Sequence, residues 1–333
     1  SSSECSPIET PTRSDRVDPR GGPRDRPRGR LVKRVGLADI RGVSSDVEIE
    51  SIRAGVRERG WVLLRGQPDL DAFAKLCRRL FSGALVHGGR REQTGADASV
   101  QSVDPGEHAI GPHCEYAYTP LRPDLVAFHC RRPADSGGET TLVDGVALHA
   151  ALRASTRAAF EARRVAYDNE IPTIGWQRMF GPIAPTELDA RLHALAAAMR
   201  ALPGCRESLM HRLRGEGPLW YRYTAPALIA GARGVGLADS ACGFPDRPDR
   251  SRPGKQTWVR FDDGEPIAAD IRHEVMREQG EALAIAHRWR AGDTIIADNW
   301  SMLHGRRAFT GTRVIDAAFG RAPWLHPIDR VIF

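Results

Sequence analysis

Short apolar segments, each ended by charged or turn-forming residues, set the strongest limit on how this chain can fold. Every apolar stretch is interrupted well before the roughly 18 residues that a membrane-spanning helix needs, so no segment is expected to cross a bilayer. Several of these stretches read as short strands, at residues 61–64, 125–130, 139–143, 219–224, 256–261, 294–297 and 314–319. The sequence therefore predicts a protein rich in strands, with no membrane partner.

Long segments with helical patterning separate these strands. Ser45 is placed to cap a helix over residues 46–59, which Gly60 ends. Further helices are expected near residues 69–81, from 144 to about 164, and at 188–201 and 269–286. Short strands with such insertions favour a mainly β protein with a jelly-roll core and helical insertions over a regular βαβ array. No phosphate-cradling Gly-x-Gly-x-x-Gly follows a strand, which weakens a dinucleotide-binding interpretation.

The first 33 residues differ in composition from the rest. They are rich in Ser, Pro, Arg and Gly, and cannot bury enough apolar surface to offset the entropy of ordering. We expect residues 1–33 to be a disordered leader and residues 34–333 to form a single domain. The leader lacks the apolar region of a secretory signal, so the cytoplasm is the expected compartment. A lid is expected near residues 170–187, where glycines alternate with Trp176 and Phe180.

The net charge of +6 is carried almost wholly by arginine. Only Lys33, Lys75 and Lys255 are lysines among the 48 basic residues, which leaves 48 − 3 = 45 arginines. This skew is typical of codon usage in a GC-rich genome, and no helix-turn-helix, zinc-finger or aromatic-basic pattern accompanies it. We therefore expect no nucleic-acid partner. The six cysteines form no Cys-x-x-Cys pair, which argues against a zinc ribbon or a disulfide framework.

One pattern points to a metal. His113-Cys114-Glu115 is the one His-x-acidic triplet in the chain, and an extended backbone there would send both ligand-type side chains to the same side. Two histidines and one carboxylate on one face of iron leave three positions for a co-substrate and oxygen. His304 is the expected third ligand, delivered from the strand at 294–297 into a polar loop. Arg313 opens the next strand, where its guanidinium could hold the distal carboxylate of an organic acid.

These features, taken in order, resemble a known family. The set is His113-x-Glu115, Gly137-Gly138-Glu139-Thr140, Asp298-Asn299, His304-Gly305-Arg306 and Arg313. It resembles the taurine dioxygenase superfamily of iron(II)/2-oxoglutarate oxygenases, and most closely the branch with the syringomycin-type hydroxylases of antibiotic and other natural-product biosynthesis. The resemblance runs from about residue 60 to residue 320. It implies a double-stranded β-helix, the cupin-like form of the jelly roll.

The resemblance also implies roles for single residues. His113, Glu115 and His304 would bind Fe(II). Thr140 would hydrogen-bond the carboxylate of 2-oxoglutarate, and Arg313 would form the salt bridge to its C5 end. Fe(II), 2-oxoglutarate and O2 are then the cofactor and co-substrates, and succinate and CO2 are released.

Two positions bear on the substrate. Ala317 stands where taurine dioxygenase has a second, sulfonate-binding arginine, which argues against a sulfonate. Halogenating members replace the carboxylate ligand with a small residue, so Glu115 argues against halogenation and gives mild support to an amino-acid-like substrate. The expected reaction is oxidation, by default hydroxylation, of an unactivated C–H of an amino acid or amino-acid-derived intermediate in specialised metabolism. Desaturation, epoxidation or cyclisation, a free or carrier-tethered substrate, and the oligomeric state stay open.

Four residues are candidates for substrate contact. Arg122 would bind a carboxylate, Asp239 an amine, and Tyr116 and His108 would line the pocket, although surface placement or packing is an alternative for each. Asp298 and Asn299 are expected to orient the loop of His304. Two other functions remain open from the sequence: a catabolic oxygenase of a small organic acid, and a metal-free basic binding protein on the same scaffold.

Overall fold

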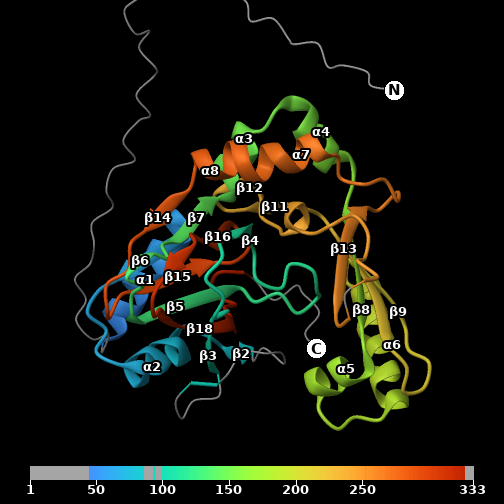
Figure 1. Ribbon diagram of the computed structural model, residues 1–333, viewed down its shortest axis with the longest axis horizontal. Helices are drawn as coiled ribbons and strands as arrows, with labels where there is room; N and C mark the ends of the chain where they lie inside the picture. The colour runs from blue at the N-terminus through green and yellow to red at the C-terminus, as the bar shows by residue number, and fades with distance from the viewer. Residues whose placement is uncertain (1–44, 86–92, 95–98, 252, 327–333) are drawn as a thin grey trace, which may run out of the picture. The chain divides into compact units, whose positions relative to one another are not determined.

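The computed structural model describes residues 45–85, 93–94, 99–251 and 253–326 of the 333-residue chain. The chain divides into two units, Ser1–Gly36 and Leu37–Phe333. The first unit, and with it the leader expected over residues 1–33, lies outside the described residues. Antiparallel sheets and several helices make up the described part (Figure 1). No helix within it is long and apolar enough to cross a membrane.

The first elements follow the sequence prediction closely. Helix α1 (Asp46–Arg59) begins with a capping box, in which the Ser45 hydroxyl accepts a hydrogen bond from the Glu48 amide at 3.3 Å. It ends at Gly60, whose φ of 84° is left-handed and costs a glycine little. Strand β1 (Trp61–Leu64) and helix α2 (Leu70–Leu80) follow.

A large sheet forms one side of the core. Its strand order is β1, β15 (Thr294–Asp298), β5 (Leu125–Arg132), β18 (Val314–Arg321) and β2 (Gly83–Leu85), and β3 (Val100–Ser102) also pairs with β18 (Figure 1). Both faces are buried. Leu125 and Ala127 of β5 pack under α1 and α2, while Val126 and Phe128 pack on the opposite face. Burial on both faces explains why these strands read as continuous apolar runs.

A smaller sheet carries the residues singled out for chemistry. Its order is β14 (Ile285–His287), β7 (Thr140–Asp144), β16 (Met302–Arg306) and β4 (Ile110–His113). A separate two-stranded sheet pairs β17 (Phe309–Thr310), which follows β16, with β6 (Ser136–Gly137), which precedes β7. The prediction that His304 emerges in a polar loop is wrong. His304 lies inside β16 because that strand is hydrogen-bonded on both sides, to Leu142 of β7 and to His113 of β4.

The middle of the chain builds a third sheet, with β13 (Gln256–Phe261), β8 (Val165–Ile171), β10 (Leu219–Ala225) and β9 (Ser208–Arg212) in that order. The strands expected at 219–224 and 256–261 are confirmed as β10 and β13. Helices α5 (Thr173–Phe180) and α6 (Pro185–Ala201), the hairpin β11 (Leu228–Gly231) with β12 (Gly234–Leu237), and the short η1 (Ala241–Gly243) complete this part. The lid expected near 170–187 falls on α5, whose Trp176 is fully buried and donates its indole N–H to the Gly217 carbonyl at 2.9 Å.

Two long helices of the sequence prediction are interrupted. The helix expected from 144 to about 164 is two helices, α3 (Gly145–Ala151) and α4 (Ala154–Ala162). The helix expected over 269–286 consists of α7 (Ala269–His273), a π-helical turn η2 (Glu274–Gln279) and α8 (Gly280–Ala282), and the chain then enters β14. The two interruptions meet. The buried carboxylate of Glu274 accepts hydrogen bonds from the Arg153 amide and the Thr156 hydroxyl, both at 2.5 Å, and so satisfies the start of α4.

Candidate metal centre

Three candidate ligands meet at one end of the small sheet. His113 is the last residue of β4, and His304 stands directly opposite it in the antiparallel register of β16. Glu115 does not continue the strand, as an extended 113–115 segment would require. It begins a turn, in which the following residue, Tyr116, takes a left-handed φ of 57°. The strand pair and this turn together bring Glu115 beside the two histidines.

The geometry of this triad suits a metal ion. One ligand atom from each of His113, Glu115 and His304 lies within 4.8 Å of the others. Nε2 of His304 is 3.8 Å from Oε2 of Glu115, and the two imidazole centroids are 4.3 Å apart. The Nδ1–H of His113 donates to the Gly111 carbonyl at 3.0 Å, which leaves the lone pair on Nε2. Both Glu115 and His304 are buried.

Asn299 fixes the backbone of the ligand turn. Its Oδ1 accepts from the Glu115 amide at 2.8 Å, and its Nδ2 donates to the carbonyls of Glu115 at 2.9 Å and Pro123 at 3.1 Å. Asn299 is fully buried, so these bonds are shielded from water. The side chain predicted to orient the His304 loop is thus bonded to Glu115, the ligand in the turn after β4.

The residue between the two ligands faces away from them. Cys114 is buried, its Sγ lies 3.5 Å from the Met302 carbonyl, and burial raises the pKa of its thiol to about 12. The thiol therefore stays protonated at neutral pH and is a poor ligand. Ser240 holds the Cys114 backbone from both sides, accepting from its amide at 3.1 Å and donating to its carbonyl at 2.8 Å.

A small pocket of about 60 Å³ opens beside the triad. Its lining includes all three candidate ligands together with Thr140 and Arg313. Thr140 begins β7 and accepts a hydrogen bond from the indole N–H of Trp289 at 3.1 Å. Because that bond occupies an acceptor position of Oγ1, the hydroxyl proton remains available to a ligand. The pocket therefore brings the three candidate metal ligands together with the hydroxyl donor of Thr140 and the cation of Arg313.

Arg313 is a partly buried cation. Its Nε donates to the Gly138 carbonyl at 3.1 Å, and no carboxylate within the described ranges pairs with its guanidinium. Burial lowers its pKa to about 10, and the charge of Arg306 acts in the same direction. A guanidinium in such surroundings gains from an incoming dianion, which can accept two parallel hydrogen bonds.

The structure distributes the four substrate-contact candidates differently. Arg122 is 4% exposed and donates to the carbonyls of Ala238 at 2.7 Å and Asn299 at 2.5 Å, with its guanidinium 4.1 Å from the centroid of the Trp300 ring. It thus links two loops. His108 is exposed, and its carbonyl accepts from Arg306 at 2.9 Å.

Tyr116 and Asp239, the other two, have different surroundings. Tyr116 packs edge-on against Phe319, an inward-facing residue of β18, with the ring centroids 6.4 Å apart. Asp239 is 5% exposed and accepts from the Ala241 amide at 3.1 Å, one residue from the Ser240 that grips Cys114. It does not line the pocket beside the triad.

Lys255 is a further candidate, which no sequence motif marks. Its Nζ lies 4.5 Å from the centroid of the Tyr118 ring, and Tyr118 is three residues beyond Glu115. Lys255 is exposed to solvent, so its ammonium group is accessible to a ligand. A row of rings connects it to the interior, because Tyr118 lies 6.1 Å from Tyr116. Its rarity as one of three lysines was the only available signal.

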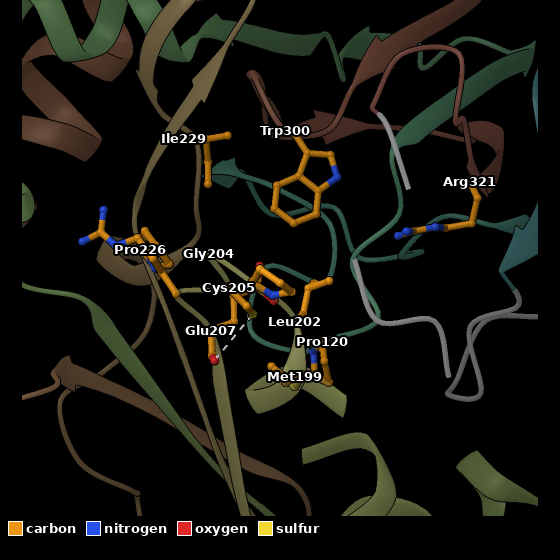
Figure 2. Close-up of a pocket in the computed structure, with 12 residues that line it drawn as sticks. Pro120, Met199, Leu202, Gly204, Cys205, Glu207, Pro226, Ile229, Trp300 and Arg321 are labelled. Carbon is orange, nitrogen blue, oxygen red and sulfur yellow. Dashed lines mark hydrogen bonds between the residues drawn. The ribbon is translucent and has the colours of Figure 1, made fainter. Parts of the chain in front are cut away.

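A larger cavity of about 270 Å³ lies elsewhere, at the end of α6. Figure 2 shows the indole of Trp300 pointing toward Leu202 and Cys205 across this cavity, with Arg321 at its side. None of the triad residues lines it. The cavity is therefore separate from the pocket beside the triad.

Comparison with known proteins agrees with this geometry. A family model described as taurine catabolism dioxygenase TauD, TfdA family, matches residues 25–318. The chain is 24% identical over 289 residues to a clavaminate synthase-like protein of Arabidopsis thaliana, covering 79% of this chain and 82% of that one. It is 22% identical over 280 residues to the dapdiamide synthesis protein DdaC of Enterobacter agglomerans, covering 78% and 82%.

A solved structure has a similar fold. It is asparagine oxygenase in complex with Fe(II), 2S,3S-3-hydroxyasparagine and succinate, with a TM-score of 0.52, 18% identity, and coverage of 86% of this chain and 84% of that one. The family model covers most of the chain and includes the triad together with Thr140 and Arg313. The chain thus belongs to the TauD/TfdA family and is an Fe(II)/2-oxoglutarate-dependent dioxygenase.

Proposed function

We propose that this dioxygenase hydroxylates an unactivated C–H of an amino acid or an amino-acid-derived intermediate, with release of succinate and CO2. The observation that carries the proposal is the joining of the His113, Glu115 and His304 triad to the cation of Arg313 in one pocket. The family membership and the likeness to asparagine oxygenase support a jelly-roll core, with the large and small sheets as its two layers.

The triad fits Fe(II). Two imidazoles and one carboxylate are the donor set of oxygen-activating ferrous sites, which keep open positions for small ligands. Glu115 and His304 are both buried, and a cation held between them would offset the cost of desolvating the carboxylate. Asn299 and the Gly111 carbonyl hold Glu115 and His113 in place.

Thr140 and Arg313 fit 2-oxoglutarate. Arg313 would form the bidentate pair with the C5 carboxylate, and Thr140 would donate its hydroxyl proton to a carboxylate oxygen. Iron and 2-oxoglutarate together supply the O2-dependent oxidation of a C–H bond, while this chain binds, orients and excludes water. Trp289 contributes by holding the Thr140 hydroxyl in one orientation.

An amino-acid-like substrate is supported by two relatives. Asparagine oxygenase has been solved with a hydroxylated asparagine, and DdaC is a dapdiamide synthesis protein. Arg122, the arginine expected to bind a substrate carboxylate, is engaged elsewhere, because it donates to main-chain carbonyls. The same holds for two arginines next to His304: Arg306 donates to main-chain carbonyls, and Arg307 pairs with Glu281 at 2.5 Å.

We assign the carboxylate-binding role to Lys255 instead. It reaches the ligand turn through Tyr118 and pairs with no carboxylate in the described part of the chain. Ala317 carries no charge on the inner face of β18, so the cation has to come from another element. Tyr116 would then lie between the substrate and Phe319. Carrier tethering of the substrate is compatible with this arrangement, as is a free amino acid.

Succinate formation tests the proposal. The full chain would be reconstituted with Fe(II) without oxygen, then mixed with 2-oxoglutarate, O2 and a panel of free amino acids and their amides and esters. We expect substrate-dependent succinate and a product heavier by one oxygen. His113→Ala or His304→Ala should abolish both, whereas His273→Ala, at an exposed histidine, should not. Wild-type-like turnover in either ligand variant would overturn the assigned site.

The panel also tests the substrate class. Turnover of sulfonates or aryloxyacids, with every amino-acid derivative inert, would contradict an amino-acid-like substrate and leave the iron assignment intact.

A further inference from the structure

A second cluster of ligand-type side chains lies in the third sheet and its covering helix, away from the triad. Asp189 and His193 stand four residues apart on α6, which places them on the same face of that helix. Helix α6 packs against β9, where His211 is the fourth residue. The helix and the strand thus bring three side chains together across a packed interface.

The three side chains are close enough to share one ion. One ligand atom from each of Asp189, His193 and His211 lies within 4.8 Å of the others. Nε2 of His211 is 2.8 Å from Oδ1 of Asp189, and Nδ1 of His193 is 3.3 Å from Oδ2. The Nδ1–H of His193 donates to the Asp189 carbonyl at 3.0 Å, which leaves the lone pair of His193 on Nε2. The two imidazole rings meet edge to face, with centroids 4.4 Å apart. Each carboxylate oxygen therefore has an imidazole beside it.

Burial is graded across the cluster. The side chain of His211 is 4% exposed, that of Asp189 is 40% exposed and that of His193 is 70% exposed. One ligand is buried in the protein, and the other two are open to solvent. Such a site admits a hydrated ion and lets it keep a water molecule.

We propose that Asp189, His193 and His211 form a second divalent-metal site, which takes a borderline ion of the Zn2+ type. Two imidazoles and one carboxylate are a common zinc donor set, and a water completes the tetrahedron. The site shares no residue and no secondary-structure element with the His113, Glu115 and His304 triad, so the two ions bind independently. Its ion ties α6 to β9 and stabilises the folded state by mass action.

Metal titration tests this site. Tag-free full-length chain carrying His113→Ala and His304→Ala, so that the triad no longer competes, would be dialysed against Zn2+ and its bound metal measured. We expect one equivalent of Zn2+ and a higher melting temperature. Adding His193→Ala should weaken Zn2+ binding at least tenfold and remove the thermal shift. His193 is largely exposed, so this substitution should leave the fold intact.

A matched control is present in the chain. His273 is also exposed and faces a carboxylate, with Nδ1 3.1 Å from Oε1 of Glu278, but no third ligand joins them among the described residues. His273→Ala should leave Zn2+ binding unchanged. The chain with an intact triad serves if the triad variant folds poorly. It should bind two equivalents of Zn2+, and His193→Ala should reduce this to one. Two outcomes would overturn the proposal and show a hydrogen-bonded network of imidazoles and a carboxylate instead. Either His193→Ala and Asp189→Asn leave Zn2+ binding unchanged, or the chain binds no Zn2+ beyond that held by the triad.

Discussion

The Nε–H of Arg313 donates to the carbonyl of Gly138 at 3.1 Å, and so ties the start of β18 to the turn that precedes Thr140. The two residues assigned to 2-oxoglutarate therefore belong to one hydrogen-bonded unit. Gly138 has a φ of 75°, and a Cβ there would lie 3.2 Å from Cδ of Arg313. The turn thus requires a glycine for its backbone and for the approach of the arginine.

Replacing Arg313 should weaken 2-oxoglutarate binding selectively. Arg313→Met removes a charged hydrogen-bond pair worth about 2–3 kcal/mol, which corresponds to a roughly 100-fold higher KM for 2-oxoglutarate. Arg313→Lys should give a KM between those of the wild type and Arg313→Met, because lysine keeps the charge and loses the bidentate geometry. Steady-state succinate assays would measure both. Arg307→Met, at an arginine paired with Glu281, is the control, and an equal effect there would count against a specific role for Arg313.

The indole of Trp289 should act through Thr140. Trp289→Phe removes the hydrogen bond to Oγ1 and should raise the KM for 2-oxoglutarate by up to about tenfold, with a smaller change in kcat. Thr140→Val should have a larger effect. In the double variant the Trp289 change should add little, because its partner is already gone. If the two free-energy changes were strictly additive in this double-mutant cycle, Trp289 would not act through Thr140.

Asn299 should support both the fold and the metal ligand. Asn299→Ala leaves buried backbone groups of Glu115 and Pro123 without partners, so we expect a loss of about 3 kcal/mol of stability in urea. Iron affinity should fall by about 10–100-fold because the ligand turn is released. Asn169→Ala is the matched control, since Asn169 is equally buried but lies in the third sheet. It should cost stability and leave iron affinity near the wild-type value.

Asp239 should make stability depend on pH in an unusual direction. Burial raises its pKa from 3.8 to about 6, against the opposing effects of the Ala241 amide and the Arg122 charge. The folded state then binds the proton more tightly than the unfolded state, so stability falls as pH rises from about 4 to about 6. The penalty at neutral pH is about 3 kcal/mol.

Asp239→Asn tests this directly, since it keeps an acceptor for the Ala241 amide. Urea unfolding should show a variant more stable than wild type at pH 7.5, with the difference shrinking toward pH 4.5. Asp168→Asn is the contrasting case, because Asp168 is held by Arg222 at 2.9 Å and its loss should destabilise at pH 7.5. A pH-independent gain from Asp239→Asn would contradict the assigned cause.

Local signals in the sequence sufficed for much of the fold. The cap at Ser45, the break at Gly60 and the buried strand at 125–130 each depend on neighbouring residues, and each is confirmed. The order of short motifs likewise predicts the family, and the match to the family model confirms that prediction. His304 was placed in a loop because both of its strand partners, Leu142 and His113, are distant in the chain.

Side-chain environment was the harder part of the site. Nothing in the sequence distinguishes a buried arginine that bonds two carbonyls, such as Arg122, from surface arginines. Lys255 meets Tyr118 only through the fold, and the carboxylate of Glu274 interrupts two helices from a distance. Such contacts between remote segments override local propensity.

The triad and the third sheet occupy separate hydrogen-bonded ladders. His113 and His304 are spaced by the pairing of β4 with β16, whereas β13, β8, β10 and β9 form a sheet of their own in the described part of the chain. Substitutions in the third sheet therefore leave this strand pairing unchanged, and they reach the ligand turn only through packing, since Cys114 shares one apolar core with Tyr167. A chain built this way can acquire a new substrate in evolution while its oxidising centre remains intact.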